Sequence, residues 1–408
     1  MITDFNKTKS IKVATVGGTP TISKTQCLKI TSGDDSTTGT GEIVLDWTNI
    51  SSKSDIAVYD ENDTLLDYYF ESFDDTEETA VIWVYRAWEQ DDTVQVKIAY
   101  GNGDSDQSVG ASTVFDNESD LQAGYLFNES SGDLLDVTSN GNDGTVNGAT
   151  QGASGFSGGA YSFGGPNSGD YIDFPSNPFD SFMDGNNDYT IIAYFEADTL
   201  DGAYIFDNYS NKTTLYIEQA YYRYDGTSYT MSFDNAVIDQ KYLHIFTYDS
   251  SNGGEFWVNG VLEGSNGNTG SFDNASGGNT KIGIDDQEHV ERGFGGLIAH
   301  LRIYSSIISD DDKIAINAAM KTTPDFFSQE AAVSPTTLTG QITLNEVGVS
   351  ATVIGYNETT STFLGYSATD GSGNYTFTEA GLAGDIILVA AQHDGAEKYG
   401  RVKTIELS

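Results

Sequence analysis

The stretch that decides the fold lies at residues 189–195 and reads Tyr-Thr-Ile-Ile-Ala-Tyr-Phe. It is a continuous run of β-branched and aromatic residues, which favour strands. Similar runs, separated by turn residues, recur between about residues 114 and 323, at 159–163, 171–174, 243–248, 254–260 and 296–304. Their number and spacing predict a jelly roll in which two broad sheets fold over one another.

Two flanking segments repeat the strand-and-turn pattern. The first has runs at 43–47, 55–60, 80–85 and 94–100, and a polar stretch at 104–112 reads as a linker. The second flanking segment follows Pro335. We therefore predict an all-β protein with three domains, at 1–108, 109–325 and 335–408. The clearest helix is expected at 309–320, where Ser309 and the aspartates after it suit a helix N-terminus.

The charge balance excludes two classes of partner. The chain has 61 acidic and 19 basic side chains and a net charge of -42, which opposes binding to nucleic acid and to anionic membranes. Because concentrated salt screens such self-repulsion, we expect a salt-rich medium; an ordinary acidic secreted β protein is the alternative. Cys27 stands alone, and we find neither an export signal nor an apolar run long enough for membrane insertion.

Ordered motifs in the middle segment resemble those of concanavalin A-like, or laminin G-like, lectin jelly rolls. The motifs are residues 124–133, the turn 136–146, 158–163 with 170–172, the Phe-Trp-Val-Asn-Gly-Val stretch at 256–261, and 296–304. They span about two hundred residues in the family's order. The resemblance implies a concanavalin A-like fold and a lectin-like role.

The flanking segments resemble other modules. Residues 55–60, 68–73, 81–84 and 99–102 are similar to an uncharacterised β domain that precedes such lectin-like domains in archaeal and bacterial surface proteins and in their viruses. Residues 338–342, 349–353 and 369–377 resemble the carboxypeptidase regulatory-like domain. The resemblances imply an N-terminal β-sandwich and a C-terminal immunoglobulin/transthyretin-like sandwich that acts as a spacer or adhesion module.

A turn rich in carboxylates and amides is a candidate calcium site. Asp136, Asn140, Asn142 and Asp143 offer the oxygen ligands that calcium prefers. The resemblance implies calcium at this turn, with a carboxylate from the closing strand, where this chain has Ala299 and His300 instead. The alternative is that these residues only supply turn conformations.

A tyrosine-rich stretch is the candidate ligand site. Residues 216–229 hold the densest aromatic cluster, and an aromatic ring stacks on a sugar while its hydroxyl forms hydrogen bonds. Strand alternation places Tyr222 and Tyr224 on one face and Tyr221 and Arg223 on the other. We assign ligand binding to Tyr222, Arg223, Tyr224 and Tyr229; the alternative is that one face belongs to the core.

Hydrolysis is disfavoured by the arrangement of the carboxylates. Retaining glycosidases of this fold need paired carboxylates on one strand face. The Glu-x-Asp triplets at 61–63 and 118–120 fall in turn-like stretches and have no following Glu. The four histidines are scattered and form no zinc pattern or catalytic triad. We therefore expect a protein that is not an enzyme.

Together these features favour an external virion protein of a virus of a halophilic archaeon, such as a tail fibre, tail tip or capsid turret. Its expected partners are a host cell-surface glycan or glycoprotein, other virion proteins and further copies of the chain in a homo-oligomer. A cell-surface adhesin of a halophile and a purely structural capsid decoration protein are the alternatives. The expected location is the virion exterior, or else the cell surface.

Overall fold

A computed structural model describes residues 5–406. Its gaps lie at 14–20, 23, 35, 90–93, 102, 104, 155–157, 176, 201–203, 209–212, 225–226, 235, 273–277, 321–326, 330–335, 342, 345–346, 349–350, 358–361, 369, 371, 373, 382–385 and 394–402. The described chain is almost entirely β, which confirms the predicted fold class. Within it, no helix has the length and apolar character needed to span a membrane.

An eight-stranded antiparallel sheet forms one layer of the jelly roll. Its order is β13 (Thr150–Ser154), β14 (Gly159–Gly164), β25 (Gly295–Tyr304), β16 (Tyr189–Ala197), β21 (Lys241–Asp249), β22 (Gly253–Val258) and β23 (Val261–Asn266), and β11 (Leu121–Tyr125) also pairs with β25. Strands β16, β21 and β25 are buried along almost their whole length. Both faces of these strands are therefore covered.

A seven-stranded sheet forms the second layer. Its order is β12 (Thr145–Asn147), β15 (Tyr171–Phe174), β24 (Thr280–Ile282), β17 (Tyr204–Asn208), β18 (Thr213–Tyr216), β19 (Gln219–Tyr224) and β20 (Thr227–Ser232). The main core lies between the two sheets and is built from their inward-facing aliphatic and aromatic side chains. The residues of β20 are mostly exposed, so the outer face here meets solvent.

The N-terminal domain is a sandwich of two smaller sheets. One has the order β4 (Gly39–Thr40), β26 (Phe327–Gln329), β1 (Lys7–Val13), β10 (Val94–Tyr100) and β6 (Ile56–Asp60). The other is β5 (Ile43–Leu45), β3 (Gln26–Ser32), β8 (Thr79–Val84) and β7 (Tyr68–Asp74), and β2 (Thr21–Ile22) pairs with β9 (Trp88–Glu89). Strand β26 comes from a segment that we had assigned to no domain, so the chain returns from the jelly roll to complete this sheet.

The C-terminal segment is also built of antiparallel strands. Four of them form a sheet in the order β31 (Thr362–Ala368), β30 (Ala351–Asn357), β33 (Ile386–His393) and β34 (Lys403–Glu406). In addition, β27 (Thr336–Gln341) pairs with β32 (Asn374–Gly381), and β28 (Thr343–Leu344) pairs with β29 (Val347–Gly348).

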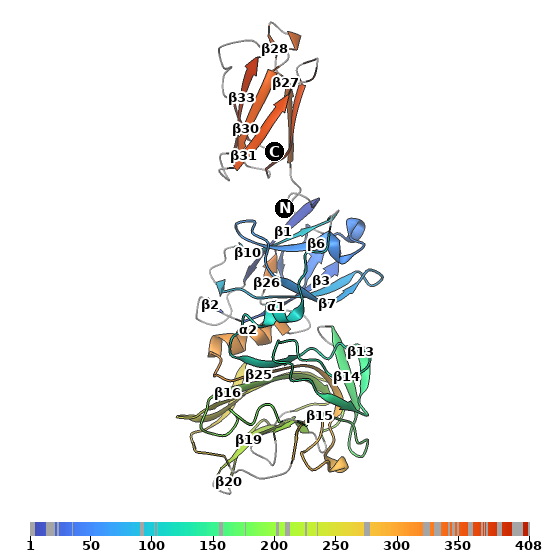
Figure 1. The fold of residues 1–408 in the computed structure, drawn as a ribbon, viewed down its shortest axis with the longest axis vertical. Coiled ribbons are helices and arrows are strands. Elements are labelled where there is room, and N and C mark those ends of the chain that lie inside the picture. Colours follow the sequence, from blue (N-terminus) through green and yellow to red (C-terminus); the bar gives the residue numbers. More distant parts are fainter. Residues whose placement is uncertain are drawn as a thin grey trace.

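Two helices lie between the N-terminal sandwich and the jelly roll (Figure 1). The predicted helix is confirmed as α2 (Asp310–Met320), where the Ser309 hydroxyl accepts a hydrogen bond from the Asp312 N–H at 3.1 Å. The predicted linker is partly wrong, because it contains the start of α1 (Ala111–Phe115). Val114 and Phe115 are fully buried among residues of both domains, and this packing gives the polar stretch a fixed path.

Buried ion pairs join the two domains beneath these helices. The Arg302 guanidinium of β25 lies 3.5 Å from the Glu118 carboxylate and donates a hydrogen bond to the Thr25 carbonyl at 3.2 Å. The Thr25 N–H in turn donates to Glu118 at 2.7 Å. The Lys24 ammonium contacts the Asp120 carboxylate at 2.9 Å. Because Lys24 and Thr25 come from the N-terminal domain, the three contacts that involve them hold the jelly roll to it, whereas the Arg302–Glu118 pair lies within the jelly roll.

Aromatic contacts reinforce the same boundary. The Trp83 ring of β8 stacks on His300 of β25, with ring centroids 5.3 Å apart and planes inclined by 12°. The Arg302 guanidinium lies 4.9 Å from the Trp83 ring and also donates to His300 Nε2 at 2.8 Å. Glu71 of β7 accepts hydrogen bonds from Trp83 Nε1 at 2.7 Å and from the Gly159 N–H at 3.3 Å. The eight-stranded sheet is therefore covered on its outer face by the N-terminal domain.

Candidate functional site

The tyrosine-rich stretch forms β18, β19 and β20, and the predicted alternation of its side chains is observed. Tyr222 is fully buried, and its hydroxyl donates to the carbonyl of Asn266 at 3.2 Å. Its ring stacks on Phe272 at a centroid distance of 5.4 Å. The assignment of Tyr222 to ligand binding is therefore wrong, because its side chain faces the core between the sheets.

The other predicted ligand residues lie at different depths. Tyr229 is half-buried and stacks on Tyr222 with ring centroids 5.5 Å apart. Arg223 is half-buried in β19 opposite Ser228. The side chain of Tyr224 lies outside the described residues. Arg223 alternates with Tyr222 along the strand, so it belongs to the outer face and remains a candidate for ligand contact.

The outer face of the seven-stranded sheet carries three other tyrosines in contact with one another. Tyr204 of β17 pairs in register with Tyr216 of β18, and their ring centroids lie 4.3 Å apart. Tyr216 stacks on Tyr221 of β19 at 5.7 Å with an interplanar angle of 28°. Tyr216 and Tyr221 belong to the stretch that the sequence singled out, whereas Tyr204 comes from a separate strand.

A groove of about 350 Å³ opens beside these rings. We name it the tyrosine groove; its walls are Leu200, Tyr204, Tyr216, Ile217, Glu218, Gln219, Ser232, Asp234 and Arg292. The groove combines aromatic rings with carboxylates, an amide, a hydroxyl and a guanidinium. Such a set contacts the apolar face of a sugar and hydrogen-bonds its hydroxyls.

The loop at 283–294 holds the arginine of the groove in place. The Arg292 guanidinium pairs with Asp285 at 2.7 Å, and His289 Nδ1 lies 2.6 Å from the same carboxylate. The Asp286 N–H donates to Asp207 of β17 at 2.9 Å, which fastens the loop to the sheet. Burial raises the pKa of Asp207 to about 7.

In the predicted calcium turn, backbone N–H groups donate hydrogen bonds to the carboxylate of Asp136. Asp136 Oδ1 accepts from the Gly124 N–H at 3.1 Å and the Thr138 N–H at 2.9 Å, and Asp136 Oδ2 accepts from the Asn142 N–H at 3.0 Å. Asn140 and Asn142 turn their amide nitrogens toward the Gln122 carbonyl, at 3.0 and 2.9 Å.

The remaining ligand of the predicted calcium set is also engaged. Asp143 Oδ1 accepts from the Asp136 N–H at 2.8 Å. Within the described part of the chain, no group of three or more His, Cys, Asp or Glu side chains is arranged to hold a metal ion. Both carboxylate oxygens of Asp136 and one of Asp143 therefore accept hydrogen bonds from backbone N–H groups. Calcium binding stays a prediction that a chelator experiment checks.

The carboxylates considered for hydrolysis have other contacts. Glu118 and Asp120 lie in the junction of the two domains, and on the N-terminal surface Glu61 pairs with Arg86 and Asp63 with Lys97. The histidines differ in burial. His244 and His300 are fully buried, and burial lowers the pKa of His244 to about 3. His289 is half-buried and is the partner of Asp285 described above.

Comparison with protein families identifies two regions. Residues 166–315 match the Concanavalin A-like lectin/glucanases superfamily, in the family called Laminin_G_3. Residues 52–140 match a domain of unknown function, DUF2341, and this match runs across the domain junction and past β11. The central domain is therefore concanavalin A-like. No curated protein sequence matches the chain.

Similar solved structures include domain 4 of AbnA, an extracellular arabinanase of Geobacillus stearothermophilus, with 21% identity over 48% of this chain and 98% of that chain (TM-score 0.37). The binding domain of Paraclostridial Mosquitocidal Protein 1 is 10% identical to this chain, and the match covers 70% of this chain and 76% of that domain (TM-score 0.40). Trypanosoma rangeli sialidase is 11% identical to this chain, and the match covers 64% of this chain and 43% of the sialidase (TM-score 0.35).

Proposed function

We propose that this protein is an external attachment protein whose jelly roll binds glycan in the tyrosine groove. The observation that carries the proposal is the contact of Tyr204, Tyr216 and Tyr221 beside Arg292 on the outer face that the N-terminal domain leaves uncovered. Tyrosine rings supply a large rigid surface at low entropic cost, and the rings here, one buried (Tyr204) and two half-buried, are held in place by one another.

The setting that we propose is the exterior of a virus of a halophilic archaeon. The net charge of -42 supports it, because such a surface needs concentrated salt to limit self-repulsion. The tyrosine groove would meet a glycan or glycoprotein of the host surface, while the flanking domains contact other virion proteins or further copies of the chain. A cell-surface adhesin and a purely structural decoration protein remain the competing functions.

Binding to a set of immobilised oligosaccharides tests the groove. We expect the full-length protein to bind at least one of them, and Tyr216→Ala, which removes a wall of the groove, to weaken that binding at least about tenfold. Tyr171→Ala is the matched control: Tyr171 lies on the same outer face in β15, but outside the lining of the groove. Equal loss in both variants, or no loss in Tyr216→Ala, would place the site elsewhere.

Two measurements test the setting. Labelled antibody against the protein should decorate purified virus particles of a halophilic host, whereas labelling of uninfected cells would favour the adhesin. Attachment to host cells should also weaken when the salt concentration falls, because unscreened acidic surfaces repel. A particle component that binds neither cells nor glycans would be a decoration protein.

A further inference from the structure

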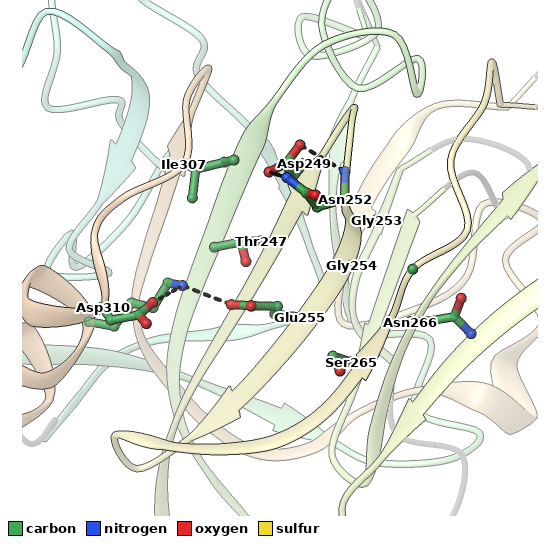
Figure 2. Close-up of a pocket in the computed structure, with 12 residues that line it drawn as sticks. Thr247, Asp249, Asn252, Gly253, Gly254, Glu255, Ser265, Asn266, Ile307 and Asp310 are labelled. Carbon is green, nitrogen blue, oxygen red and sulfur yellow. Dashed lines mark hydrogen bonds and ion pairs between the residues drawn. The ribbon is translucent and has the colours of Figure 1, made fainter.

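A second cavity opens at the other sheet, and nothing above assigns it a function. It has a volume of about 300 Å³ and lies where β21, β22 and β23 meet the start of α2. We name it the corner pocket; its walls are Thr247, Asp249, Asn252, Gly253, Gly254, Glu255, Ser265, Asn266, Gly267, Ile307, Asp310 and Lys313. Figure 2 shows Thr247, Glu255 and Ser265 on three successive strands, with Asp310 facing Glu255.

The position of the corner pocket follows from two neighbouring rows of side chains. Ile245 pairs in register with Trp257, and both pack into the cluster that fills the domain junction. The next row is polar: Thr247 pairs with Glu255, and Glu255 pairs with Ser265. The pocket therefore lies where the apolar cover of the eight-stranded sheet ends.

A buried ammonium fixes two of the carboxylates. The side chain of Lys313 is 1% exposed, and its Nζ contacts Glu255 at 3.2 Å and Asp310 at 2.9 Å. The Lys313 Nζ also lies 4.7 Å from the Trp257 ring. Glu255 and Asp310 therefore keep their oxygens in defined positions at one end of the pocket (Figure 2).

The opposite end is closed by a turn. Asp249 accepts hydrogen bonds from the Ser251 N–H at 2.7 Å and from the Asn252 amide at 2.6 Å. Burial opposes ionisation of Asp249, but these hydrogen bonds outweigh it and lower its pKa. Gly253 has φ +89°, and a β-carbon there would meet the Asn266 carbonyl, so the turn needs glycine.

We propose that the corner pocket binds a cationic, polyhydroxylated ligand of monosaccharide size, an amino sugar with a free amine. The walls carry three carboxylates, Asp249, Glu255 and Asp310, and one ammonium, Lys313, so the lining has a net charge of -2. The hydroxyls and amides of the walls suit a ligand with many hydroxyl groups, and exposed Ile307 offers an apolar contact. This inference is independent of the tyrosine groove.

Titration with glucosamine, followed by NMR or calorimetry at about pH 6 to keep the amine protonated, tests the ligand class. We expect glucosamine to bind at least about tenfold more tightly than N-acetylglucosamine, which has the same hydroxyl pattern on its ring but no charge. Absence of glucosamine binding, or equal affinity for the two sugars, would overturn the proposal.

Two variants locate the site. Ser265 is exposed, so Ser265→Phe should fold normally and fill the pocket, abolishing glucosamine binding. Asp310 is 65% exposed, and Asp310→Asn leaves Glu255 to pair with Lys313 while removing one charge; it should weaken glucosamine at least about threefold. Tyr171→Ala, outside both the corner pocket and the tyrosine groove, is the control and should leave glucosamine affinity unchanged. Unchanged glucosamine binding in Ser265→Phe would refute the proposal for the corner pocket, whether or not the tyrosine groove binds glycan.

Discussion

The two outer faces of the jelly roll are built on strands of the same fold but meet different surroundings. Against the eight-stranded sheet lie the N-terminal domain, α1 and α2, and the outward side chains Ile192, Leu243 and Ile245 are buried there. The seven-stranded sheet instead carries tyrosines and ion pairs on its outer face. One outer face is therefore buried by the rest of the chain, whereas the other is open to solvent at β20.

The largest loss of stability is expected from removing a buried charge at the outer face of the eight-stranded sheet. Arg302→Ala would leave the buried Glu118 carboxylate with the more distant Lys24 ammonium, at 3.8 Å, as its cationic partner within the described part of the chain, and should lower the free energy of unfolding by about 3–5 kcal/mol. Denaturant unfolding of the full chain measures this. A paired variant, Arg302→Met with Glu118→Gln, should recover part of the loss because no buried charge is left unpaired. A loss below about 1 kcal/mol in Arg302→Ala would mean that the junction is not tightly packed.

A second test separates the two sides of one strand on the open sheet. Tyr222→Ala removes a core ring and should cost about 3 kcal/mol of unfolding free energy, without a direct effect on ligand contacts. Tyr221→Ala removes a half-buried outer ring and should cost about 1 kcal/mol, yet weaken glycan binding, because Tyr216 in the groove wall loses the ring that it stacks on. Equal destabilisation by the two variants would contradict the assignment of faces.

A third test uses pH to probe the junction. Burial raises the pKa of Glu71 to about 8 from its usual 4.5, so the folded state keeps a proton that the unfolded chain releases. The stability that this group contributes is therefore present below about pH 4.5 and is lost as the pH rises toward 8. Glu71→Gln mimics the protonated acid and should raise the free energy of unfolding at pH 8 by about 1–3 kcal/mol relative to wild type.

The control for this variant is its behaviour at low pH. At about pH 5 the wild-type side chain is already protonated in the folded state, so wild type and Glu71→Gln should differ by under about 1 kcal/mol. Asp207→Asn offers the same comparison on the open sheet, where burial raises the carboxyl pKa to about 7. A constant difference between wild type and Glu71→Gln from pH 5 to 8 would show that Glu71 titrates normally.

The smallest effect is expected from removing metal. Because protein donors occupy both oxygens of Asp136, we expect a chelator to shift the melting temperature by less than about 2 °C. Metal analysis of the purified protein accompanies this measurement. A larger fall in the melting temperature, together with bound calcium, would establish the calcium site predicted from the sequence and require the turn to rearrange.

Local patterns in the sequence determined much of the fold. Runs of β-branched and aromatic residues predicted most of the long strands, and Ser309 with the aspartates after it predicted α2, because these signals depend on neighbouring residues alone. The same pattern predicted that residues 216–229 hold a dense aromatic cluster with alternating faces. These features need no knowledge of what lies opposite each strand.

Tertiary structure decided which face of each strand is free. Alternation shows that Tyr221 and Tyr222 point in opposite directions, but only the packing of the second sheet shows that Tyr222 enters the core. Tyr204 joins the groove from another strand, and β26 joins the N-terminal sheet from beyond the jelly roll. Burial and long-range pairing depend on contacts between residues far apart in the chain, so the sequence determined the elements and the tertiary structure selected the surfaces.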